Sequence, residues 1–72
     1  MKKFDPTHPW VVFQQTDKGG RYFTGQAHPT SPDAWTPDIR KAIRCTSEQI
    51  GNVMDHARAY TWPWATTKER AR

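Results

Sequence analysis

The densest apolar run of the chain is Trp-Val-Val-Phe at residues 10–13, and polar residues follow it directly. β-Branched and aromatic residues favour strands, so we predict a strand over about residues 9–16. Residues 17–20 are Asp-Lys-Gly-Gly, and glycines supply the positive φ that tight hairpin turns need. A second strand over about residues 21–26 puts Arg21 and Phe23 on one face and Tyr22 on the other. These segments predict a β-hairpin.

The first predicted strand is apolar on both of its faces, since residues 10–13 contain no polar position. A single helix covers one face, and that face holds either Trp10 and Val12 or Val11 and Phe13. We expect the other face to be covered by the Trp-Pro-Trp segment at residues 62–64 or by a partner.

A helix is predicted from about residue 46 to residue 60. Thr46 and Gln49 have the spacing of a capping box, in which each side chain bonds the other residue's backbone N–H. Positions that follow the i, i+3, i+4, i+7 rule carry apolar residues: Ile50, Val53, Met54 and Ala57. One apolar stripe of this helix is therefore expected to face the sheet.

The segment between hairpin and helix is rich in turn signals. Residues 27–34 contain two prolines and a serine and predict a loop. Thr36 suits a helix N-cap and Pro37 the first helical position, which predicts one short helical turn with Ile39 and Ala42 facing inward. Residues 43–45 are predicted to form a short third strand, and residues 61–66 an edge strand or extended tail.

These elements predict a single α+β domain over residues 1–72. Its architecture is a small antiparallel β-hairpin or three-stranded sheet packed on one C-terminal amphipathic helix. The ends, about residues 1–8 and 66–72, are short, charged and poor in apolar residues, so we expect them to fray.

Composition and charge indicate the cellular compartment of the chain and the kind of partner it favours. The net charge is +4, and the basic residues are spread along the chain, so a mild positive field favours nucleic acid or an acidic protein surface. The single cysteine, Cys45, allows no intrachain disulfide. No signal-peptide core and no apolar run of membrane length is present. We therefore expect a cytoplasmic protein that does not enter a membrane.

Catalytic and metal chemistry find little support in the sequence. The residues that suit zinc, His8, His28, Cys45 and His56, lack the short spacing of structural zinc sites. A Cys45–His56 nucleophile pair is formally possible, but the two residues are eleven positions apart and need not meet, so we expect Cys45 to be a cysteine packed at a strand end. We predict no enzyme activity, no metal and no cofactor.

Binding is the better supported class of function. Tyr22 and Phe23, with Arg21 and Lys18 beside them, resemble a base-stacking platform, although no dense basic stripe and no complete ribonucleoprotein motif accompany them. Trp, Tyr and Arg also dominate protein-interface hot spots. We expect a monomer that binds a protein through six candidates: Trp10, Tyr22, Arg40, Arg44, Trp62 and Trp64. Trp35 is expected to be a core anchor.

The order of these elements suggests a family. A Tyr-Phe-Thr-Gly strand at residues 22–25, a Trp-led turn at 35–42 and a capped helix from Thr46 resemble a common class of short phage-encoded proteins. Length, charge and tryptophan content also resemble a small RNA polymerase-binding transcription regulator of a Xanthomonas phage. That resemblance implies an inhibitor in the host bacterial cytoplasm. It would bind host RNA polymerase near the β′ N-terminus and the β flap, displace σ, block initiation and suppress termination.

Small phage proteins that inhibit CRISPR effector complexes are a second possible class, and a basic nucleic-acid-binding module is a third. Salt discriminates between them, because phosphate binding weakens steeply with salt and an interface centred on aromatic residues weakens less.

Overall fold

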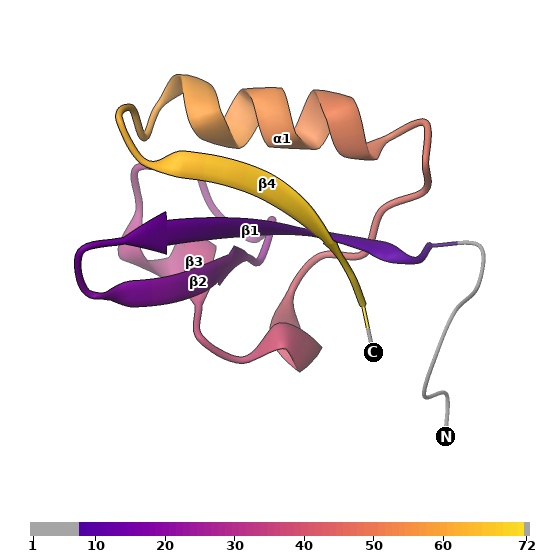
Figure 1. Cartoon of the computed structure of the whole chain (residues 1–72), viewed down its shortest axis with the longest axis horizontal. Helices are drawn as coiled ribbons and strands as arrows, with labels where there is room; N and C mark the ends of the chain where they lie inside the picture. The colour runs from indigo at the N-terminus through magenta and orange to yellow at the C-terminus, as the bar shows by residue number, and fades with distance from the viewer. Residues whose placement is uncertain (1–7, 72) are drawn as a thin grey trace.

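The computed structural model describes residues 8–71, and the predictions for residues 1–7 and 72 lie outside this range. The elements in chain order are β1 (Trp10–Thr16), β2 (Gly19–Phe23), the 3₁₀ turn η1 (Pro32–Ala34), β3 (Trp35–Thr36), the 3₁₀ turn η2 (Ile39–Lys41), α1 (Ile50–Ala59) and β4 (Ala65–Arg70). Figure 1 shows α1 running along β4 and β1, and η2 lying away from α1.

The sheet has four antiparallel strands in the order β3-β2-β1-β4. The α+β class is therefore confirmed, with one strand more than predicted. In the hairpin, Gln14 lies opposite Arg21 and Phe13 opposite Tyr22, so the predicted alternation in the second strand is correct. That strand starts earlier than expected, at Gly19. A Cβ on Gly20 would lie 2.5 Å from the Phe13 ring, so any side chain at this position would force the ring to shift.

The predicted fraying of residues 66–72 is wrong for residues 66–71. All six residues of β4 pair with β1, from Ala65 opposite Gln15 to Arg70 opposite Trp10. The backbone N–H of Ala71 then donates to the carbonyl of Pro9 at 2.6 Å. Ladder hydrogen bonds come from the backbone and need no apolar side chains. A polar sequence at the edge of a sheet is therefore compatible with a strand.

The predicted third strand at residues 43–45 is also corrected. Of these residues, only Cys45 forms a β-bridge, an isolated one to Trp10, while the Ile43 N–H donates to the Phe23 carbonyl at 3.0 Å. The third strand is instead Trp35–Thr36, which pairs with β2. Thr24, the residue after β2, extends this pairing by donating its backbone N–H to the Ala34 carbonyl at 2.7 Å.

The main core lies between the sheet and α1. Val12 and Phe23 supply the sheet side, and Ile50 and Ala57 supply the helix side. Trp10 packs on the edge of this cluster, so the face that takes Trp10 and Val12 is the one under the helix. The apolar stripe predicted for the helix is confirmed, since Val53 and Met54 also pack against this cluster.

The opposite face of β1 is covered by the segment around η2. Val11 is buried against Ala42 and Ala71, and Ile39 and Tyr22 pack beside them. The inward placement of Ile39 and Ala42 was predicted correctly. The expectation that residues 62–64 or a partner would cover this face was wrong, because the η2 segment places Ile39 and Ala42 there.

The capping box is present as predicted. The Thr46 N–H donates to Gln49 Oε1 at 3.0 Å, and the Gln49 N–H donates to Thr46 Oγ1 at 3.1 Å. These bonds close a turn before α1, which itself begins at Ile50. After α1, the Thr61 side chain donates to the Ala57 carbonyl at 2.8 Å, and the chain turns towards β4.

Candidate binding groove

An open groove of about 430 Å³ lies between the loop before β3 and the turn after α1. Its aromatic rings and a cationic side chain come from five residues: Arg21, Trp35, Tyr60, Trp62 and Trp64. We call this feature the aromatic groove. Proline and hydroxyl side chains of residues 29–32 and Thr61 complete the lining.

One wall of the groove is built on Trp35. Its indole N–H donates to the Pro29 carbonyl at 2.8 Å, and its ring packs on Phe23 with centroids 5.2 Å apart. The Arg21 guanidinium lies 4.2 Å from the centroid of the Trp35 ring. Such cation–π stacking holds an arginine flat against the ring. Trp35 is therefore a structural anchor, as expected, and also a surface of the groove.

A buried glutamine connects this wall to the other one. Gln14 is fully buried, and its Oε1 accepts from Arg21 Nε at 2.9 Å and Nη2 at 2.5 Å. Its Nε2 donates to Thr61 Oγ1 at 2.6 Å and Thr66 Oγ1 at 3.0 Å. All four bonds that a glutamine amide can form are made. The network fixes Arg21 relative to the turn that carries the other aromatic residues.

The other wall is the most exposed aromatic surface of the described chain. Trp62 is 83% exposed and Tyr60 is 52% exposed, while Trp64 is half-buried. Tyr60 also packs edge-on against His28, at 4.3 Å between ring centroids, and against His56 at 5.5 Å. Exposed large rings in a concave surface are typical of interaction sites.

The groove has an unbalanced positive charge. Partial burial lowers the pKa of the Arg21 guanidinium, which still remains a cation near neutral pH. Within residues 8–71, no carboxylate forms an ion pair with Arg21, whose hydrogen bonds go to the neutral amide of Gln14. The aromatic groove therefore favours an anionic ligand group.

The structure brings together two of the six predicted binding residues, Trp62 and Trp64. Trp10 lies outside the groove and is half-buried. Its indole N–H donates to Ser47 Oγ at 3.3 Å, and Lys68 Nζ lies 4.5 Å from its ring centroid. Trp10 thus packs within the fold at the far end of β1.

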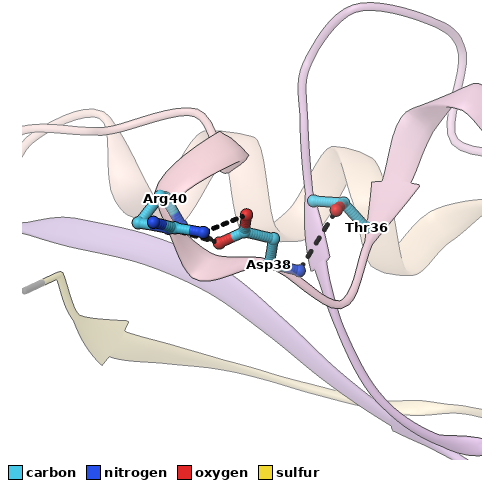
Figure 2. Close-up of polar contacts among 3 residues, drawn as sticks. All are labelled: Thr36, Asp38 and Arg40. Atoms are coloured by element: carbon cyan, nitrogen blue, oxygen red, sulfur yellow. Dashed lines mark hydrogen bonds and ion pairs between the residues drawn. The ribbon is translucent and has the colours of Figure 1, made fainter.

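Tyr22 and Arg40 also lie outside the groove. The Tyr22 hydroxyl donates to Glu69 Oε1 at 3.3 Å, and its ring packs on Phe13. Arg40 is exposed, and its Nε and Nη2 donate to the two oxygens of Asp38, each at 3.1 Å (Figure 2). These bonds hold the pKa of the Asp38 carboxyl below its usual range. Tyr22 belongs to the face covered by η2, and Arg40 to η2 itself.

Arg44 lies near a second pocket, of about 370 Å³, with Cys45, Ile43 and His8. Its Nε donates to the His8 carbonyl at 3.4 Å. Burial raises the pKa of the Cys45 thiol, which therefore stays protonated at neutral pH. A protonated, buried thiol is a poor nucleophile.

Sequence reasoning missed Arg21, Trp35 and Tyr60 as parts of one binding surface with Trp62 and Trp64. The available signal was the hairpin register, which places Arg21 beside Gln14, but the sequence does not show where residues 60–64 lie. Among residues 8–71, no three His, Cys, Asp or Glu side chains are grouped closely enough to hold a metal ion.

Comparison with known proteins finds no matching family model, no matching curated protein and no similar solved structure. Within the described residues, no helix has the length and apolar character needed to cross a membrane.

Proposed function

We propose that this chain is a phage-encoded inhibitor that binds host bacterial RNA polymerase and regulates transcription, with the aromatic groove as its contact surface. The observation that carries a binding function is the exposure of Trp62 and Tyr60 in a concave surface that also holds Arg21. Exposing large rings to water is unfavourable, and a partner that buries them gains the corresponding free energy.

The composition of the groove favours a protein partner. Trp, Tyr and Arg are the residues most enriched in interface hot spots, and the groove combines all three types in one place. Nucleic-acid binding without sequence preference needs several cations along a backbone-tracking groove. Arg21 is the one cation that lines this groove within the described residues.

The choice of RNA polymerase rests on the resemblance to small phage transcription regulators. In this proposal the chain occupies the polymerase surface near the β′ N-terminus and the β flap, where it displaces σ, blocks initiation and suppresses termination. The mechanism is steric and stoichiometric, and it needs no catalytic residue.

The test uses purified bacterial RNA polymerase, as core enzyme and as σ holoenzyme. We expect the chain to bind the core enzyme, to compete with σ and to reduce transcripts from a σ-dependent promoter. Trp62→Ala should weaken binding by at least about tenfold, as for a hot-spot tryptophan. Its stability should change by no more than about 0.5 kcal/mol, because the side chain is exposed.

Arg40→Gln is the matched control, since Arg40 is exposed and lies outside the groove. It should bind RNA polymerase as the unchanged chain does. Failure of the unchanged chain to bind either form of the polymerase would reject this partner. Binding to a CRISPR effector complex under the same conditions would then assign the groove to defence inhibition.

A further inference from the structure

The chemistry of the groove ligand is indicated first by Arg21. A guanidinium has five N–H groups, and two of them, on Nε and Nη2, point to Gln14 Oε1. The other three have no hydrogen-bond partner among residues 8–71. Because Gln14 and the Trp35 ring hold the group in place, it is preorganised to receive a carboxylate in the groove.

The second indication comes from the indoles. Trp10 and Trp35 donate their indole N–H groups to Ser47 and to the Pro29 carbonyl. Within the described residues, Trp62 and Trp64 have no such acceptor, and both line the groove. Aromatic-lined grooves with free donors suit the polyproline II conformation, which is extended and leaves its backbone carbonyls without internal hydrogen bonds.

We propose that the aromatic groove binds an acidic, proline-containing extended segment of a protein, with its carboxylate on Arg21 and a proline ring against Trp62 and Trp64. This inference deepens the proposed function, and it rests on that function insofar as the partner is a protein. The positive net charge of the chain favours the approach of such an acidic segment.

The test is a titration of the full-length chain with short blocked peptides, followed through the indole N–H signals in NMR spectra. The probe is a peptide of alternating glutamate and proline. Two comparison peptides replace glutamate with glutamine or proline with serine, and an oligothymidylate of similar length is the nucleic-acid probe. Trp62 and Trp64 signals should shift on binding of the first peptide, while that of Trp10 should stay in place.

We expect each replacement in the peptide to weaken binding by about tenfold, which corresponds to the loss of one strong contact. Arg21→Gln should abolish the preference for glutamate over glutamine, whereas Arg40→Gln should retain it. Trp62→Ala should weaken binding of both peptides that contain proline. Because Trp62 is exposed, this variant should stay folded, and it tests the groove even if Arg21→Gln unfolds. These results together would support the proposal.

Absence of saturable binding of the glutamate-proline peptide up to about 1 mM would overturn the proposal. Preferential binding of oligothymidylate would also overturn it and would assign the groove to nucleic acid. If the chain binds RNA polymerase through Trp62 but the peptide neither binds nor competes, the proposed function stands and this inference fails. If the peptide binds and the polymerase does not, the inference stands with a different protein as partner.

Discussion

Replacing Gln14 with leucine tests the network that joins the sheet to the aromatic groove. Gln14 is fully buried and forms four side-chain hydrogen bonds, two to threonine hydroxyls and two from Arg21. Leucine fills a similar space but offers no polar atom. Thr61, Thr66 and the partly buried Arg21 would then each lose a partner.

The size of the effect follows from these bonds. Each neutral bond contributes about 1 kcal/mol and a partly solvated bond to a cation about as much. The additional apolar area that leucine buries offsets a part of this loss. We expect Gln14→Leu to lower the free energy of unfolding by about 2 kcal/mol, which for a domain of this size lowers Tm by about 10 °C.

The assay is urea unfolding followed by tryptophan fluorescence, with Gln15→Leu as the matched control. Gln15 is the neighbouring residue, but it is exposed, and among residues 8–71 its side chain bonds the Thr16 carbonyl alone, at 3.3 Å. The control should stay within about 0.5 kcal/mol of the unchanged chain. Equal stability of the two leucine variants would refute the argument that the buried amide network stabilises the fold.

Three further predictions have defined outcomes. Trp35→Ala should lower the free energy of unfolding by about 3 kcal/mol through loss of a packed ring, and a stable variant that loses only binding would make Trp35 purely an interface residue. Gly25→Ala should destabilise the fold by more than about 1 kcal/mol, because φ is +73° and the new Cβ would lie 2.7 Å from Ile43 Cδ1. Gly51→Ala, in open space on α1, should stabilise the fold by about 0.4–1 kcal/mol. A Gly25→Ala variant more stable than Gly51→Ala in urea unfolding would contradict both expectations. Burial raises the pKa of Cys45, so the folded chain holds that proton more tightly and stability should fall as pH rises above about 8.5; Cys45→Ala should lack this part of the slope, and identical pH profiles would count against it.

The elements that the sequence predicted well depend on local signals. The hairpin follows from an apolar run and two glycines, and the capping box from Thr46 and Gln49. The inward placement of Ile39 and Ala42 follows from one capped turn, although Asp38 supplies the cap and not Thr36: its side chain accepts from the Arg40 N–H at 3.0 Å.

The elements that the sequence missed depend on contacts between distant residues. The edge strand that was predicted over residues 61–66 lies instead at Ala65–Arg70. The charged residues 68–70 carry no strand signal of their own, and this segment forms β4 because β1 offers a free edge. The aromatic groove likewise joins Arg21, Trp35 and residues 60–64, which are far apart in sequence. Gln14 links them, and a glutamine in a strand gives no sign of being buried.

Binding of RNA polymerase through the aromatic groove is tested most directly by a pull-down from nuclease-treated bacterial lysate, with the full-length chain and its Trp62→Ala variant as parallel baits. We predict stoichiometric RNA polymerase subunits with the unchanged bait, identified by mass spectrometry, and strongly reduced amounts with the variant. Equal capture by both baits would contradict the role of the groove. No polymerase with either bait would contradict the proposed partner.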